Sequence, residues 1–185
     1  MEAAQRLFHE NGFGSTSLAD IAATGKLRKG NFFYHFRTKS ELLVAVIDRR
    51  FAQSAAQLRR LEADASAPAE RIIRFVRSQL EDEGPELQLA CSIGALCTEL
   101  ARTCSPALPR AREEFLLYRD WLAKQFAALG HPGQALMQAT HLLVRLQGAA
   151  ILARSLEDPS ITARELEGIA DWLQDLLDGA ANCRR

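Results

Sequence analysis

The spacing of apolar residues constrains the fold of this chain of 185 residues more than any other feature. Leucine, isoleucine and valine recur at intervals of three and four and almost never alternate with polar residues, as they would in a strand. The spacing predicts about nine helices, near residues 2–11, 17–25, 28–35, 39–63, 68–80, 87–103, 105–130, 134–155 and 162–177. We therefore expect an all-α protein.

Several of the predicted helices have recognisable ends. Gly12 follows the first apolar period and is expected to stop that helix, since glycine adopts the left-handed region readily. One of the three hydroxyl residues at 15–17 can cap the second helix, with Asp20 completing a near-capping box. Thr162 is expected to cap the last helix, with Glu165 three residues on.

Composition places the chain among ordinary globular proteins, with 48% hydrophobic and 25% charged residues. No apolar run approaches the roughly 20 residues of a membrane-spanning helix, so no membrane partner is expected. The first residues lack the apolar centre of a signal peptide, which favours a cytoplasmic location. Net charge is zero, but residues 1–50 hold eight Lys or Arg against five Asp or Glu. A basic N-terminal part joined to a mildly acidic body is typical of a nucleic-acid reader.

The charge excess is concentrated in one segment without acidic residues, 26–39. A short turn between helices with one cationic face suits a helix that lies against a phosphate backbone. On a helix over 28–35, the outer face would carry side chains able to read base edges, and Gly30 would let the backbone approach closely. The hydroxyls near residue 16 and the basic residues beyond the helix are better placed for phosphates. The predicted DNA-binding residues are Thr16, Ser17, Lys26, Arg28, Lys29, Gly30, Asn31, Tyr34, His35 and Lys39.

The segment AAQRLFHENGFGSTSLADIAATGKLRKGNFFYHFRTKSELLVAV resembles the N-terminal domain of the TetR family of bacterial transcriptional regulators. The resemblance implies a three-helix helix-turn-helix domain at 1–46 and a larger helical ligand-binding and dimerisation domain at 47–185. It also implies a homodimer in which the last two helices pair and the middle helices enclose a ligand. Two positions depart from the family pattern, because Gly25-Lys26 replaces a small residue followed by glycine, and Phe33 stands where many members have tyrosine.

The body offers aromatic and polar side chains for a pocket that would take a planar organic effector. An ordinary aromatic core is the alternative for each of them, and Glu99 is a further possible polar anchor. The predicted ligand residues are Phe75, Gln79, Cys97, Phe115, Tyr118, Trp121, His141 and Arg145.

Wide apolar stripes on the last two predicted helices would be costly to leave in water. A twofold four-helix interface would cover them and would set two recognition helices at the spacing of successive major grooves. The predicted interface residues are Leu142, Leu146, Ala149, Ala150, Ile169, Trp172, Leu173 and Leu176.

These features together predict a ligand-responsive repressor that binds a palindromic operator as a homodimer, at the nucleoid when bound, and is released by a small organic effector. A thiol-based redox regulator using Cys91, Cys97 or Cys104 is the alternative. An adaptor that has lost DNA binding is disfavoured by the acid-free basic segment. We expect no enzyme, because the sequence shows no nucleophile–base pair or phosphate-cradling glycine loop. We likewise expect no cofactor and no metal, since metal-ligand spacings are missing.

Overall fold

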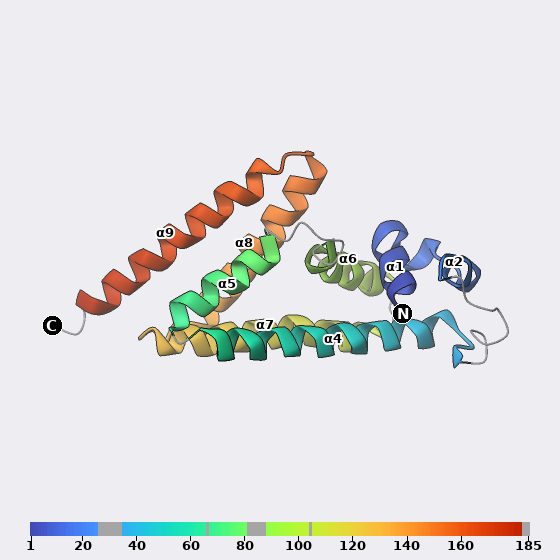
Figure 1. Ribbon diagram of the computed structural model, residues 1–185, viewed down its shortest axis with the longest axis horizontal. Helices are drawn as coiled ribbons and strands as arrows, with labels where there is room; N and C mark the ends of the chain where they lie inside the picture. Colours follow the sequence, from blue (N-terminus) through green and yellow to red (C-terminus); the bar gives the residue numbers. More distant parts are fainter. Residues whose placement is uncertain (26–34, 66, 81–87, 104, 183–185) are drawn as a thin grey trace. The chain divides into compact units, whose positions relative to one another are not determined.

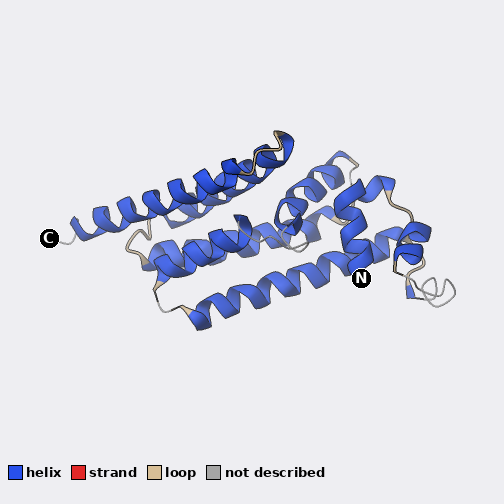
Figure 2. Cartoon of the chain, turned by 45° about the horizontal axis from the view of Figure 1, so that its top comes forward, coloured by secondary structure: helices blue, strands red, loops and turns tan. Residues whose placement is uncertain are grey.

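The computed structural model describes residues 1–25, 35–65, 67–80, 88–103 and 105–182, and every regular element in these ranges is a helix. The all-α prediction is therefore confirmed for this part of the chain (Figures 1 and 2). The helices are α1 (Glu2–Ser15), α2 (Leu18–Thr24), α4 (Lys39–Asp64), α5 (Pro68–Leu80), α6 (Gln88–Arg102), α7 (Leu108–Ala128), α8 (Ala135–Ser155) and α9 (Ser160–Asn182). The helix predicted near 28–35 lies outside the described residues except for its last position.

The chain divides into two compact units. The first unit comprises Met1–Ser54 and Ser92–Glu114, and the second comprises Ala55–Cys91 and Phe115–Arg185. Helices α4 and α7 each contribute to both, while most of α6 joins the N-terminal helices. The predicted boundary after residue 46 was drawn from sequence similarity, whereas these two units are defined by contacts between residues. The two divisions therefore need not coincide, and the units do not test the predicted boundary.

The core of the second unit is built from α5, α7, α8 and α9. Helix α8 packs along α9, and α5 packs against both (Figure 1). Phe75 of α5 and Phe126 of α7 are fully buried there together with Leu142 and Ile169. Within each of these helices the buried apolar residues recur at intervals of three and four, so each helix turns one apolar stripe inward.

The ends of α1 and α2 largely follow the sequence signals. Gly12, which was expected to stop the first helix, has φ 80° and ψ 160°, a conformation that favours glycine, and it kinks the chain there. Helical turns resume beyond the kink, so α1 ends at Ser15 rather than near Asn11. Ser17 caps α2: its hydroxyl accepts the Asp20 N–H at 3.1 Å, and its own N–H donates to the Asp20 carboxylate at 2.9 Å. The capping-box prediction is confirmed.

The predicted start of the last helix was wrong. Helix α9 begins at Ser160, whose N–H donates to the Asp158 carboxylate at 2.9 Å. Hydrogen bonds from Ser160 lower the pKa of Asp158, so this end carries a carboxylate that complements the N–H groups of the first turn. Thr162 instead donates its hydroxyl to the Pro159 carbonyl at 2.8 Å. Glu165 is paired with Arg145 of α8 and takes no part in a cap.

Candidate nucleic-acid interface

Part of the predicted DNA-binding surface lies among the described residues, at the corner between α1 and α2. Helix α2 buries Ile21 and Ala22 and leaves Ser17 and Asp20 exposed. This orientation follows from the apolar spacing of α2, and it turns the capped N-terminus of the helix toward solvent. His35, after the undescribed segment, is exposed as well. The remaining predicted DNA-binding residues, which lie outside the described ranges, are Lys26, Arg28, Lys29, Gly30, Asn31 and Tyr34.

Thr16 lies inside the corner rather than on its surface. Its side chain is 2% exposed, and its hydroxyl hydrogen-bonds to two carbonyls of α1, at 2.8 Å to Gly12 and 3.1 Å to Leu7. The hydroxyl thus ties residue 16 to α1 on both sides of the kink at Gly12. Of the two predicted phosphate-binding hydroxyls, only that of Ser17 is exposed.

Lys39 begins α4 and reaches back to the same corner. Its ammonium group donates to the carbonyls of Phe13 at 2.7 Å and Gly14 at 3.0 Å. It also lies 4.5 Å from the centroid of the Phe13 ring, a cation–π distance. Two of its three donors thus serve the fold, so its predicted phosphate contact would have to use the third.

Glu99 of α6 contacts the other side of that corner, a role that sequence reasoning missed. Its carboxylate accepts the N–H of Phe13 at 2.9 Å and the N–H of Gly14 at 2.6 Å. The sequence signal that could have shown it is the Gly12-Phe13-Gly14 triplet, because paired glycines often mark a backbone approached closely by another group. Sequence analysis considered Glu99 only as a ligand anchor.

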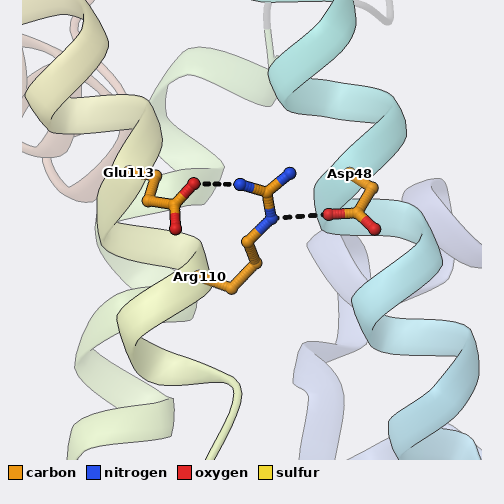
Figure 3. Close-up of polar contacts among 3 residues, drawn as sticks. All are labelled: Asp48, Arg110 and Glu113. Carbon is orange, nitrogen blue, oxygen red and sulfur yellow. Dashed lines mark hydrogen bonds and ion pairs between the residues drawn. The ribbon is translucent and has the colours of Figure 1, made fainter.

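Helix α4, which follows the helix-turn-helix segment, is tied to α7 within the first unit. Arg110 of α7 donates to Asp48 of α4 at 2.6 Å and also pairs with Glu113 (Figure 3). The hydrogen bond to Asp48 raises the pKa of Arg110 further, so the guanidinium stays charged. Its flat face lies 5.0 Å from the Phe51 ring. These contacts fix one face of α4 against α7.

A buried ion pair makes a second tie between the same two helices. Arg50 of α4 donates to Glu114 of α7 at 2.8 Å, and their side chains are 8% and 2% exposed. Ser54 donates its hydroxyl to the same carboxylate at 2.8 Å. Such a pair favours one alignment of the two helices, because another alignment would leave a buried charge without its partner, which costs much free energy.

Most of the predicted ligand residues belong to the second unit. Phe75, Tyr118 and Trp121 are buried in contact, with ring centroids 5.2 Å and 5.6 Å from Phe75. The Trp121 indole donates to Glu62 at 2.9 Å. Phe115 and Gln79 are half-buried on the same helices.

The other predicted ligand residues lie in two further places. His141 and Arg145 of α8 lie beside Trp172 of α9, at 5.3 Å and 5.8 Å from its ring centroid. Cys97 of α6 belongs to the first unit and is a free, half-buried thiol. Burial and the nearby Glu114 raise the pKa of Cys97, which keeps it protonated.

The predicted dimer residues require a correction. Five of them, which are buried in the core of their own chain and have no free surface for a partner, are Leu142, Leu146, Ala149, Ile169 and Leu173. Ala150, Trp172 and Leu176 are half-buried. The exposed apolar residues of α8 are different ones: Leu136, Met137, Val144, Ile151 and Leu152. Sequence periodicity could not separate the two faces, because α8 is apolar on both.

The described residues contain no group of three or more His, Cys, Asp or Glu that could hold a metal ion. None of their helices combines the length and hydropathy needed to cross a membrane.

The N-terminal part of the chain is similar in sequence to a known protein family. Residues 1–46 match the family described as bacterial regulatory proteins, tetR family. The N-terminal domain of this chain belongs to the TetR family. TtgR, a transcriptional regulator of Pseudomonas putida, is 42% identical over 48 residues, or 26% of this chain and 23% of that protein. The Mycobacterium tuberculosis repressor Rv3405c is 48% identical over 48 residues, 26% of each.

The chain as a whole has the same fold as solved TetR-family structures. SCO4454, a TetR-family regulator from Streptomyces coelicolor, superposes with a TM-score of 0.81 at 20% identity, covering 95% of this chain and 93% of that one. The curated relatives, in contrast, match over only about a quarter of their length. The TetR similarity therefore has two parts: close sequence likeness in the corner and a shared all-helical fold in the body.

Proposed function

We propose that this protein is a transcriptional repressor that binds a palindromic operator as a homodimer, in the cytoplasm, and is released by a small organic effector. The observation that carries the proposal is the match of residues 1–46 to the TetR family, across a helix-turn-helix segment with no acidic residue from 26 to 39. A basic segment of this composition suits a duplex, because phosphate neutralisation supplies much of the binding free energy. Nothing in the described residues favours an enzyme.

A homodimer is supported by the outer face of α8. Met137, Val144 and Ile151 are seven residues apart and follow one line along the helix, and each is more than half exposed. Gly148 on the same helix has open space where a side chain would be. A small residue among large apolar ones allows a second helix to approach closely, so we assign the dimer contact to this face.

An effector site is supported by the second unit. The cluster of Phe75, Tyr118 and Trp121 offers aromatic surface for a planar compound. The Gln138 side chain is buried, and its amide oxygen has no hydrogen bond among the described residues. A ligand with a donor group would satisfy that oxygen, which otherwise costs free energy. Redox control is less well supported, since the raised pKa of Cys97 opposes thiolate formation.

The experiment that tests the proposal begins with a random duplex pool from which the wild-type protein selects its operator. Affinity for the selected duplex is then measured by fluorescence anisotropy at several salt concentrations. Lys29→Ala should weaken binding to every sequence alike and lower the salt slope by about one. Lys124→Ala, which removes the same charge from an exposed position on α7, is the matched control and should change neither. An unchanged slope in Lys29→Ala, or no selected sequence at all, would overturn the proposal.

A further inference from the structure

The last turn of α1, beyond the kink at Gly12, is held by two side chains of opposite charge. On one side the Glu99 carboxylate accepts the N–H groups of Phe13 and Gly14. On the other, the Lys39 ammonium donates to the carbonyl oxygens of the same two residues. Two consecutive residues thus have their backbone donors and acceptors bonded by side chains from α6 and α4. We call these four contacts the peptide clamp.

The sequence is adapted to the clamp at Gly14. A methyl group built there would lie 3.0 Å from a Glu99 carboxylate oxygen, closer than side-chain carbons normally come. The backbone at Gly14 lies outside the left-handed region, so glycine is not required there for conformation. The close approach of the carboxylate is the remaining reason for a residue without a side chain.

We infer that Glu99 is a positioning residue for DNA binding, which links α6 to the helix-turn-helix through the peptide clamp. The inference rests on the proposed function. The clamped residues lie three and four positions before Ser17, the N-cap of α2, so the carboxylate helps to fix the backbone that leads into that helix. A shift of α6 would move this part of the backbone with it, because charge-assisted hydrogen bonds are short and about twice as strong as neutral ones.

The physical consequence concerns specific binding more than general attraction to DNA. Base contacts require the helices to be held in place, whereas phosphate attraction tolerates movement. Loss of the clamp should therefore weaken binding to the operator and leave binding to unrelated duplexes almost unchanged. Loss of one negative charge alone would do the opposite, since it strengthens attraction to every duplex. The two explanations predict changes of opposite sign.

The test uses Glu99→Gln, which keeps the shape of the side chain but leaves one acceptor oxygen for two N–H groups. Glu10→Gln, on the exposed surface of α1, removes the same charge from the same unit and is the matched control. Operator affinity should fall about tenfold in Glu99→Gln, with the specific-to-non-specific ratio falling alongside it. In Glu10→Gln neither quantity should fall. Amide hydrogen exchange at Phe13 and Gly14, measured by NMR, should accelerate about tenfold only in Glu99→Gln.

A second variant keeps the test informative if Glu99→Gln folds poorly. Gly14→Ala displaces the carboxylate while leaving every charge in place, so it should lower the same ratio. Combining both substitutions should cost little more than the larger single effect, because they remove one interaction.

The outcomes separate the inference from the proposed function. If the wild-type protein binds a selected duplex and Glu99→Gln binds it as Glu10→Gln does, the inference is overturned and the proposed function stands. Unchanged exchange at both amides in Glu99→Gln also overturns it. If the wild type selects no duplex, the proposed function fails together with the role of Glu99 in DNA binding. The exchange data would still decide whether Glu99 holds the backbone at Phe13 and Gly14.

Discussion

Substituting Val144 by lysine should separate the dimer that we assign to the outer face of α8. Val144 is 64% exposed and stands between Met137 and Ile151, which are 63% and 52% exposed. A lysine at this position would place a charge in the middle of the apolar line. In a twofold contact the substitution appears twice, once on each protomer.

The magnitude follows from the exposed fraction. Complete burial of a side chain of this size is worth about 1.5–3 kcal/mol, so covering roughly two-thirds of it on both protomers is worth about 2–4 kcal/mol. Because about 1.4 kcal/mol corresponds to a factor of ten, the dimer should weaken by about 30-fold to 1,000-fold. Repulsion between two lysines near the axis would add to this loss.

Sedimentation equilibrium over a wide concentration range measures the dissociation constant directly. Leu116→Lys is the matched control, because Leu116 is an exposed apolar residue on α7, outside the α8 face. It should leave the constant unchanged. A Val144→Lys protein that dimerises as tightly as the wild type, or a wild type that stays monomeric at high concentration, would refute the assignment.

Three further predictions concern the folded chain itself. Ser17→Ala should lower the free energy of unfolding by about 1 kcal/mol, as expected for a lost helix cap, and chemical denaturation would measure it. Hydrogen bonds from Ser17 lower the pKa of Asp20 below 3.8, so the stabilisation by the wild-type cap should be complete at neutral pH and be lost as the pH falls below that value. If the difference in unfolding free energy between wild type and Ser17→Ala already disappeared near pH 6, this reasoning would be contradicted. Phe75→Ala should cost about 3–5 kcal/mol in the same assay, because Phe75 is fully buried and contacts two other rings. The reactivity of Cys97 can be measured in a variant whose other cysteines are serine. At pH 7 its thiol should react with a disulfide reagent more slowly in the folded than in the unfolded protein, because burial raises its pKa. Equal rates would show that burial does not protect the thiol.

Local signals in the sequence predicted local structure well. The Ser17–Asp20 box and the break in helical geometry at Gly12 depend on residues within a few positions, so both can be inferred without knowing the fold, although the sequence did not show that helical turns resume after Gly12. The start of α9 failed because two neighbouring signals competed. Asp158 and Thr162 can both cap a helix, and Glu165 was needed by Arg145 on another helix.

Contacts between distant segments could not be predicted in the same way. Thr16 and Ser17 are adjacent hydroxyl residues, yet Thr16 is buried against α1, where its hydroxyl bonds to backbone carbonyls, and Ser17 is exposed, where it caps α2. Glu99 and Lys39 both looked like surface charges available to a ligand or a phosphate. Their partners are backbone atoms, which carry no sequence signature.

The amino-acid sequence by itself determined the all-helical fold class, the capped corner and the family of the first 46 residues, since helical periodicity, capping and motif similarity are properties of neighbouring residues. Only the tertiary structure decided which face of α8 is core and which remains in water, and which charges serve the fold. Both α8 faces are apolar, so their roles depend on where α5 and α9 pack. The pairing of α6 with the last turn of α1 likewise brings together residues 85 and 86 positions apart, a distance over which no periodicity extends.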